Sequence, residues 1–426
     1  MTATERDARG RPVVVVTGMG VLTSLGRGQA ENWRKLTAGE SGLRRISRFP
    51  VEGLRTTVAG TVDYVQLDEP SAPALAEAMA ALAIEEALAE AGAGRPGDFP
   101  GPLFLALPPV EIEWTQRRAL AAAAGNGAVT YAGLLRAAGS GAFTRWNRRF
   151  QFGSVGETLA DRFGTKGSPI STSTACASGG TAIQLGLEAI RRGETEAALC
   201  VGTDASVTVE SLIRFSLLSA LSTRNDPPSS AARPFSKDRD GFVMAEGAGA
   251  LVLESLAHAR ARGATILGVI EGCGEAADGF HRTRSSPDGK PIIACIARAL
   301  ADAGLEPDAV GYINAHGTGT PENDKMEWVG VSAVFGERAG SIPISSNKSM
   351  IGHTLSAAGA LEAIFTVLSL RHGRLPPTIN YDIPDPALPV DCVPNVARDA
   401  RVAHAISNSF GFGGQNVCLA IGAEPG

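Results

Sequence analysis

Short runs of β-branched and aliphatic residues alternate along the chain with stretches that have helical periodicity. The runs are Val13 to Val16, Ala198 to Val201, Ala250 to Leu253, Ile266 to Ile270 and Val417 to Ile421. Each has the length and composition of a buried strand. Alternation of such strands with helices is typical of sheets that lie between layers of helices. The pattern therefore predicts an α/β fold.

Two of the helical segments look like copies of each other. Ile84 to Gly92 reads IEEALAEAG and Ile296 to Gly304 reads IARALADAG, with six of nine positions identical. Each ends at a glycine, which commonly stops a helix, and each comes after a predicted strand. Chance similarity in an alanine-rich sequence is the alternative, but the matching order of elements favours a duplication. We therefore predict two α/β halves, residues 1–260 and 261–426.

The stretch 100–165 has a different pattern, with alanine-rich helix, two tryptophans and clustered arginines. We interpret it as an insertion in the first half, of the kind that shapes substrate access or a subunit contact. A second irregular segment, Thr17 to Gly20, follows the first strand and is predicted to be a glycine-rich turn. A dinucleotide-binding G-x-G-x-x-G pattern would need glycine at position 23, where the chain has Thr23. A nucleotide site is therefore not expected here.

Composition narrows the class of protein. The 426 residues are 44% hydrophobic and 19% charged, which excludes a disordered tail, a coiled coil and a collagen-like repeat. The formal charge of −5 is too small to attract nucleic acid or an anionic membrane over long range. The start of the chain is charged, and no apolar stretch approaches the about 18 to 20 residues of a membrane span. A globular protein that stays in the cytoplasm is expected.

The six cysteines are scattered, without the paired Cys or Cys/His spacing of a zinc site or a disulfide framework. Each, taken alone, is most simply a small buried hydrophobe. Cys176 differs because it follows the polar run Ser171 to Thr174 and precedes the helical pattern Thr181 to Arg192. The helix N-terminus would favour a thiolate, so we expect its pKa to fall from about 8.5 toward about 7 or below.

Three further segments carry candidate chemistry. His316 and His353 lie in turns rich in Gly, Thr and Ser that follow apolar strands, where a lone histidine would more often cap the backbone. Their company with Cys176 and with Lys348 makes a catalytic cluster the better hypothesis. The segment Asn408 to Asn416 is either a simple hairpin turn or a loop whose exposed amide serves as an oxyanion donor.

Six stretches of the chain, in order, resemble the motifs of elongating β-ketoacyl-acyl-carrier-protein synthases of the type II group, which belong to the thiolase superfamily. They are TACASGG around Cys176, RPFSKDRDGF from Arg233, NAHGTGT around His316, SNKSMIGHT ending at Thr354, LPPTIN from Leu375 and NSFGFGG from Asn408. The resemblance implies a duplicated thiolase-like fold with five alternating layers, αβαβα, in agreement with the suspected repeat.

The resemblance also assigns roles to matching positions. Cys176 would accept the acyl chain, His316 and His353 would stabilise the enolate left by decarboxylation, and Lys348 with its partner Glu362 would support them. The amides of Cys176 and Phe412 would form the oxyanion hole, and Phe412 would also gate the acyl pocket. Further supporting positions are Phe410, Thr318, Thr320, Asp324 and Glu327. No cofactor and no metal is expected. The expected partners are an acyl carrier protein and a second synthase subunit, in a homodimer or a heterodimer with a related synthase.

The residues argue against three related classes of protein. A degradative thiolase would carry a second catalytic cysteine in the C-terminal glycine turn, an initiating synthase would lack His353 after Lys348, and a chain-length factor would lack Cys176. Two departures from the family concern the substrate. Pro108 and Pro109 stand where a Gly-rich loop usually borders the acyl pocket.

Ser219 is the second departure, since relatives often have a basic residue there for the acidic carrier protein. Arg214 or the arginines between 117 and 149 are candidates to replace it, although a charge cluster is more often a solvated face. Three hypotheses for function remain: an elongating ketosynthase of fatty acid synthesis, including one specialised for very long or modified chains; a non-catalytic subunit that sets chain length; and a polyketide-type condensing enzyme.

Overall fold

A computed structural model of the chain describes residues 4–94, 97–125 and 129–425. One eleven-stranded sheet runs through the molecule. From one edge to the other its strands are β11 (Ile344–Ser345), β10 (Val310–Asn314), β14 (His404–Phe410), β15 (Gln415–Gly422), β9 (Gly268–Ala277), β1 (Val14–Thr23), β8 (Gly247–Ser255), β7 (Ala197–Asp204), β5 (Leu103–Ala106) and β6 (Ile170–Thr172), with β2 (Gly26–Arg27) paired to β1. Two small two-stranded sheets lie apart from it, β3 (Arg44–Arg45) with β4 (Val58–Ala59) and β12 (Arg374–Leu375) with β13 (Arg398–Asp399).

The five runs predicted as strands all lie in or overlap strands of this sheet. Apart from β2, the sheet consists of two five-stranded portions joined at one short contact, where Val14–Val16 of β1 pair antiparallel with 268–270 of β9. Each portion keeps parallel pairs at its outer edge, such as β5 with β6 and β10 with β11. The joint twists the two portions so that they face each other across a pair of helices.

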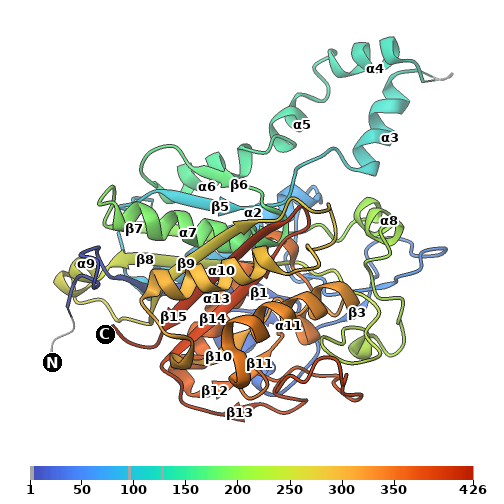
Figure 1. Cartoon of the computed structure of the whole chain (residues 1–426). Helices are drawn as coiled ribbons and strands as arrows, with labels where there is room; N and C mark the ends of the chain where they lie inside the picture. The colour runs from blue at the N-terminus through green and yellow to red at the C-terminus, as the bar shows by residue number, and fades with distance from the viewer. Residues whose placement is uncertain (1–3, 95–96, 126–128, 426) are drawn as a thin grey trace.

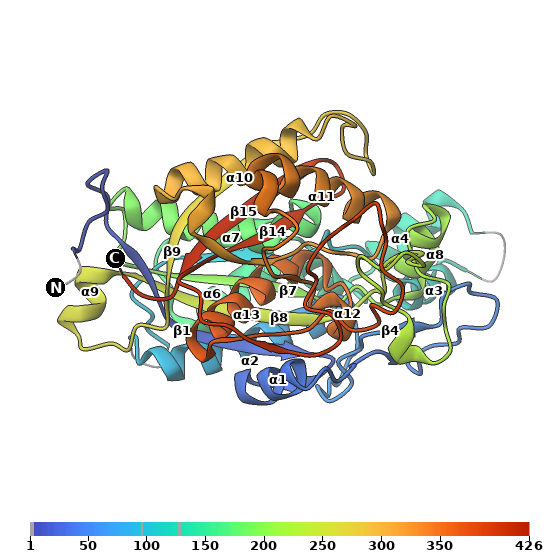
Figure 2. The same ribbon diagram turned by 60° about the horizontal axis from the view of Figure 1, so that its bottom comes forward.

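Five layers result, in the order helix, sheet, helix, sheet, helix. The central helices are α7 (Ser178–Arg191) and α13 (Ala358–His372), which contact each other and strands of both portions. Figure 2 shows α2 (Ala72–Ala91) outside the first portion, and α10 (Lys290–Ala303) and α11 (Pro321–Phe335) outside the second. Residues 358–370 of α13 are all buried, because this helix is covered on every side. The predicted αβαβα fold is confirmed.

The repeated nine-residue segments occupy equivalent places in the two outer layers. Ala87 of α2 lies against Gly18 of β1, where a Cβ would come within 2.1 Å of the Ala87 carbonyl oxygen. Ala299, at the same position of the repeat in α10, lies against Gly272 of β9, where a Cβ would come within 2.7 Å of its carbonyl oxygen. The sequence match therefore reflects one helix-on-strand contact built twice.

The glycine-rich turn predicted after Val16 is not a turn. β1 continues through Gly18 and Gly20 to Thr23, with a bulge between Val16 and Gly18 in its pairing with β8. Glycines at these positions let the helix backbone approach the strand closely, which a sequence pattern does not distinguish from a bend. The helices do end at their predicted glycines, Gly92 and Gly304, both in the left-handed conformation with φ of 58° and 69°.

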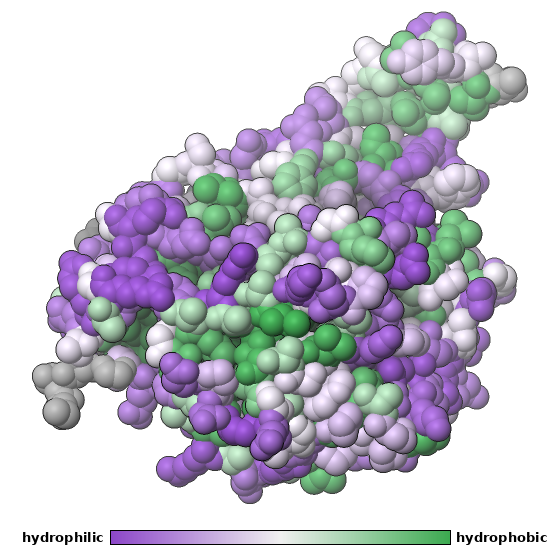
Figure 3. All heavy atoms as spheres, in the orientation of Figure 1, coloured by the Kyte–Doolittle hydropathy of each residue, from purple (hydrophilic) through white to green (hydrophobic). Residues whose placement is uncertain are grey.

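The segment that stands outside the main fold is shorter than the predicted insertion at 100–165. β5 and β6 belong to the main sheet, and α6 (Ser154–Phe163) packs against α2 and β5. Figure 1 shows the segment that stands away from the body, which consists of α3 (Trp114–Ala123), α4 (Tyr131–Ala138) and α5 (Thr144–Arg149). Hydrophobic residues are visible on its surface in Figure 3, and Tyr131 is 77% exposed.

The remaining helices are α1 (Gln29–Thr37), α8 (Val209–Leu217), α9 (Leu256–Ala261) and α12 (Lys348–Ile351). The predicted boundary near residue 260 falls at the end of α9, before β9 begins. Two short 3₁₀ turns matter for the site: η1 (Ala175–Ala177) leads into α7, and η5 (Leu355–Ala357) leads into α13. Among the described residues no helix combines the length and apolarity that a membrane crossing requires.

Candidate active site

Cys176 lies in a strained turn at the start of the central layer. Its predecessor Ala175 has φ of 50°, a left-handed conformation that is costly for a residue with a side chain. The Ser178 hydroxyl holds the turn, because it accepts a hydrogen bond from the Thr174 N–H at 2.8 Å and donates one to the Ala175 carbonyl at 2.6 Å. The thiol is buried, yet Cys176 lines two cavities that meet at this point.

His316 follows β10 and is fixed mainly through its backbone. The Glu327 carboxylate on α11 accepts the N–H groups of His316 and Gly317 at 2.8 and 2.7 Å, and it also accepts the Asn408 side-chain amide at 3.0 Å. Lys348 donates to the His316 carbonyl oxygen at 2.6 Å. Contacts from α11 and from Lys348 therefore hold the loop that carries the imidazole, whereas His316 Nδ1 itself is buried and has no hydrogen-bond partner among the described residues.

His353 follows α12 and has a defined tautomer. Its backbone N–H donates to the Val243 carbonyl at 2.7 Å, in a bridge beside Met244. Its Nδ1 accepts the N–H of Leu355 at 3.3 Å, at the start of η5. Since Nδ1 accepts, the neutral ring carries its proton on Nε2 and can donate from that side.

The fold brings these three side chains together from both halves of the chain. The Cys176 sulfur and one ring nitrogen of each histidine lie within 4.8 Å of one another, and all three residues are buried. The two imidazoles meet edge to face, with centroids 5.3 Å apart and planes at 82°. Phe410 packs against His316 and Phe242 against His353. Proximity of a sulfur to two imidazoles is the geometry that the sequence hypothesis required.

Burial sets the charge state of all three groups. Burial, reinforced by the nearby Lys348 charge, lowers the pKa of His316 and of His353 well below 6.5, so both rings are neutral near pH 7. Burial raises the pKa of the Cys176 thiol to about 11, against a smaller lowering by the Phe412 N–H and Lys348. The expected pKa of about 7 or below is therefore wrong, because desolvation of the thiol outweighs the groups that lower its pKa.

Lys348 and Glu362 form a buried ion pair beneath the histidines, the pairing that the resemblance implied. Lys348 lies on α12 and Glu362 on the central helix α13, so the pair joins the layer that carries His353 to the middle of the molecule. Such a pair is stable only when both members are present, since either charge alone would be buried without compensation.

The segment 408–416 is a hairpin, and its turn lies beside Cys176. β14 and β15 pair antiparallel, so residues 411–414 form the turn of a hairpin. Gly413 and Gly414 have φ of 91° and 87°, which favour glycine. The Phe412 N–H lies close enough to the Cys176 sulfur to lower the thiol pKa, and the Phe412 side chain lines both cavities. The turn thus places an amide donor beside the sulfur.

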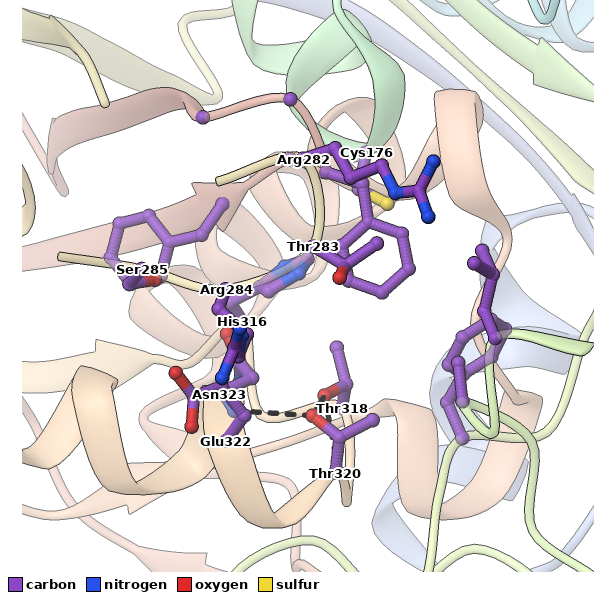
Figure 4. A pocket seen from close by; sticks show the side chains of 18 of the residues that line it. Cys176, Arg282, Thr283, Arg284, Ser285, His316, Thr318, Thr320, Glu322 and Asn323 are labelled. Atoms are coloured by element: carbon purple, nitrogen blue, oxygen red, sulfur yellow. Dashed lines mark hydrogen bonds between the residues drawn. The ribbon is translucent and has the colours of Figure 1, made fainter. Parts of the chain in front are cut away.

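The first cavity, of about 490 Å³, opens from Cys176 to the surface. Thr318 and Thr320 line it, with their hydroxyls 2.9 Å apart. Figure 4 shows Arg282, Thr283 and Arg284 along the wall of this pocket. Asp324 on α11 is buried and accepts the N–H groups of Phe235 and Gly319.

The sequence analysis did not identify the basic residues that line the opening of the first cavity. Arg282, Arg284 and Lys325 are exposed, and within the described part of the chain none of them forms an ion pair. The sequence feature that could have revealed them is the basic run from His281 to Arg284, which follows β9. Several of the arginines predicted for this role pair with carboxylates: Arg214 pairs with Glu111 at 2.5 Å, and Arg117, Arg145 and Arg149 pair with carboxylates near the projecting segment.

The second cavity, of about 670 Å³, extends from Cys176 toward 107–111. Pro108 and Pro109 line it, so the departure noted in the sequence does affect this space. Its wall also contains polar groups, among them Ser206, Thr208, Ser211 and Gln415.

Asp204, at the end of β7, also lines this cavity and was missed by sequence reasoning. The buried carboxylate accepts the N–H groups of Ser356 at 3.0 Å and Ser206 at 2.8 Å. Burial raises its pKa to about 6. Its sequence signal was an acid at the end of an otherwise apolar strand.

The Cys176, His316 and His353 atoms are close enough for a metal ion to be considered. The groups that surround these three side chains argue against metal binding and for a role in hydrogen bonding. The Nδ1 lone pair of His353 is taken by Leu355, and the Lys348 ammonium lies nearby. The arrangement favours hydrogen-bond donation to a developing negative charge over binding of a cation.

Comparison with known proteins adds independent information. Residues 11–91 and 116–259 match the family described as "Beta-ketoacyl synthase, N-terminal domain", and residues 267–382 match "Beta-ketoacyl synthase, C-terminal domain". The chain is 38% identical over 422 residues to 3-oxoacyl-[acyl-carrier-protein] synthase 2 of Synechocystis, with 96% of this chain and 97% of that protein covered.

Polyketide enzymes are also among the similar proteins. The tetracenomycin polyketide synthase ketoacyl synthase alpha subunit of Streptomyces glaucescens is 36% identical, with coverage of 94% of this chain and 95% of that one. Among solved structures, the AntDE:AntF complex, a type II polyketide ketosynthase with its acyl-carrier protein, gives a TM-score of 0.83 at 32% identity, covering 97% of this chain and 100% of that chain. The ishigamide ketosynthase/chain length factor gives 0.82 at 35% identity, covering 97% and 100%.

Proposed function

Because the chain belongs to the β-ketoacyl synthase family of condensing acyltransferases, we propose that it joins malonyl-acyl carrier protein to an acyl chain held on Cys176. The observation that carries this proposal is the buried cluster of one sulfur and two neutral imidazoles where two cavities meet. One cavity suits a thioester arm that comes from the surface, and the other suits the acyl chain.

In the first half-reaction the Cys176 sulfur attacks the acyl thioester of the carrier. The carrier thiol leaves with the proton of Cys176, and the acyl group stays on the enzyme, so that one difficult step becomes two easier ones. The raised thiol pKa means that the proton must leave as the substrate binds. The amides of Phe412 and Cys176 would stabilise the oxyanion of the tetrahedral intermediate.

In the second half-reaction the malonyl thioester loses CO₂ and leaves an enolate. Two neutral imidazole donors suit this step, because they stabilise the enolate oxygen without protonating the carbon that must react. The enolate carbon attacks the acyl-Cys176 carbonyl, the sulfur leaves, and a β-ketoacyl thioester remains on the carrier. One aimed donor is typically worth about 10²–10³ in rate. Lys348 and Glu327 would act by holding His316 in place.

A polyketide-type enzyme is the second candidate for the substrate. Hydroxyl, amide and carboxylate groups line the second cavity beside its apolar residues, and they would hydrogen-bond to an oxygenated chain. Faster acylation of Cys176 by a β-ketoacyl carrier than by a saturated acyl carrier of equal length would support this candidate. The opposite order would support fatty acid elongation.

The proposal is tested by CO₂ release and condensation with malonyl-carrier and acyl-carrier. We expect Cys176→Ala to abolish condensation and His353→Ala to lower CO₂ release by about 10²–10³-fold. Cys273→Ala, a cysteine on β9 that lines neither of these cavities, is the matched control and should keep full activity. Condensation by Cys176→Ala at the wild-type rate would remove the cysteine from the mechanism. No turnover by the wild-type protein would favour the non-catalytic, chain-length-setting role.

A further inference from the structure

A further cavity, of about 490 Å³, lies away from the active site and has no part in the proposed function. The N-terminal segment, the C-terminal end of α7, strand β9 and the C-terminal half of α10 surround it. Cys176 lies just before the other end of α7, and a helix of this length spans about 20 Å. We call it the arginine cavity, because five arginines line it: Arg9, Arg11, Arg191, Arg192 and Arg298.

One carboxylate serves three of these arginines. Asp302 on α10 accepts hydrogen bonds from Arg11 at 2.6 Å and from Arg191 at 2.7 Å. Arg9 donates to the same carboxylate at 3.4 Å. Arg11 also pairs with Asp7 at 2.7 Å, so these three cations share two acids. Positive charge is therefore in excess even where the ion pairing is densest.

Arg298 and Arg191 keep N–H groups that have no partner. Arg298 is exposed and forms no ion pair with any described residue, and its Nη1 donates to the Glu275 carbonyl at 2.6 Å. The Arg191 side chain is only 7% exposed, and its Nε is buried and meets no hydrogen-bond acceptor in the described part of the chain. A buried N–H without an acceptor costs free energy, so a ligand that brings an acceptor would relieve that cost.

These features together define the chemistry of a ligand. Arg192 is compensated, since it pairs with Glu188 at 3.1 Å and with Glu194 at 2.7 Å, but the other arginines offer surplus charge and unused donors. Guanidinium groups in such a setting match phosphate oxygens, which they bind in pairs. The arginines come from the N-terminal segment, α7 and α10, so linked phosphates reach more of them than a single phosphate does. No aromatic ring for stacking on a nucleobase is present among the described residues that line the cavity.

We propose that the arginine cavity is a binding site for a polyphosphate group, with inorganic pyrophosphate as its simplest ligand and with Arg9, Arg191 and Arg298 as the groups that hold it. The site joins the N-terminal segment and α7 of the first half to β9 and α10 of the second. A ligand that bridges these elements binds the folded chain and not the unfolded one, so it stabilises the joint between the halves. The inference does not depend on the condensing activity.

Isothermal titration calorimetry with inorganic pyrophosphate tests the site, in about 150 mM salt to screen non-specific attraction. We expect binding to the wild-type protein and a Kd about tenfold weaker for Arg298→Gln and for Arg9→Gln, since each variant loses a charged hydrogen bond. Arg34→Gln on α1 is the matched control, because this arginine is 60% exposed and does not line the cavity. Titration with ATP identifies the source of the group: equal affinity points to the phosphates of a nucleotide, and weaker binding points to the free anion.

The basic opening of the first cavity is the competing place for an anion, and a second control excludes it. The double variant Arg282→Gln and Arg284→Gln should keep the wild-type Kd for pyrophosphate. Loss of binding in this double variant, with Arg298→Gln unaffected, would overturn the inference, and so would a wild-type protein that does not bind.

Thermal unfolding gives an independent readout. Pyrophosphate at about 100 times its Kd should raise the wild-type melting temperature by about 3 °C, and the same concentration should raise that of Arg298→Gln by about half as much. Equal shifts in the two proteins would place the anion elsewhere and overturn the inference.

Discussion

At the scale of single residues, desolvation dominates the behaviour of Cys176. The thiol pKa of about 11 keeps the sulfur protonated at neutral pH. Below that pKa the thiolate fraction rises tenfold with each pH unit, so alkylation of Cys176 by iodoacetamide should accelerate about tenfold per unit from pH 7 to 9. Mass spectrometry of the Cys176 peptide measures this, with N-acetylcysteine as the reference thiol. A plateau below pH 8 would mean that the site stabilises a thiolate before substrate arrives.

Asp204 links the sulfur to one histidine. It holds the Ser356 N–H of η5, the turn whose Leu355 N–H fixes the His353 tautomer, and its charge raises the Cys176 pKa. Asp204→Asn places an amide N–H₂ against these donors, and loss of such a charged hydrogen bond costs about 1.5–3 kcal/mol. We expect CO₂ release to fall about 10- to 100-fold and alkylation of Cys176 to shift to lower pH.

The difference between Asp204→Asn and wild type should be largest above pH 6, where Asp204 is charged in the wild-type protein. Asp204→Glu keeps the charge and serves as the control, and it should retain the wild-type alkylation profile. If Asp204→Asn left both the profile and CO₂ release unchanged, Asp204 would have no positioning role.

At the scale of elements, close packing of helix on strand determines where the glycines lie. Gly272 sits against the backbone of α10, where a Cβ would be 2.6 Å from the Ala303 nitrogen. Gly272→Ala should therefore lower the urea midpoint by the equivalent of about 1–3 kcal/mol of overpacking. Gly153→Ala is the control, since a Cβ there meets nothing within 4 Å and φ is negative. Equal midpoints for the two variants would contradict this account of the repeat.

Elements with a strong local signal could be predicted from the sequence, and contacts between distant elements could not. Runs such as Val417 to Ile421 and the helix ends at Gly92 and Gly304 follow from periodicity and capping. The continuation of β1 through Gly18 and Gly20 depends on α2, which is distant in the sequence. In the same way, the residue types predicted Cys176 and the histidines as a cluster, but burial, which sets the Cys176 pKa, becomes visible only in the folded chain.

At the scale of the whole molecule, the duplicated fold explains why the site lies at its centre. Cys176 enters the central layer from the first half, and both histidines come from the second. The joint between β1 and β9 and the contact between α7 and α13 hold the halves together. A cluster built across such a joint is positioned by the whole fold, so substitutions that loosen the central layer should reduce catalysis before they unfold either half.

The projecting segment α3–α5 exposes large apolar side chains that nothing else in the chain covers among the described residues. Trp114, Tyr131 and Leu135 expose more than half of their side-chain surface there, an arrangement that is typical of a subunit contact. We expect sedimentation to give twice the 43.9 kDa of one chain. The triple variant Trp114→Ser, Tyr131→Ser and Leu135→Ser should raise the dimer Kd at least about tenfold, whereas Leu217→Ser on α8 should not. A monomeric wild type, or a dimer indifferent to the triple variant, would assign this segment another role.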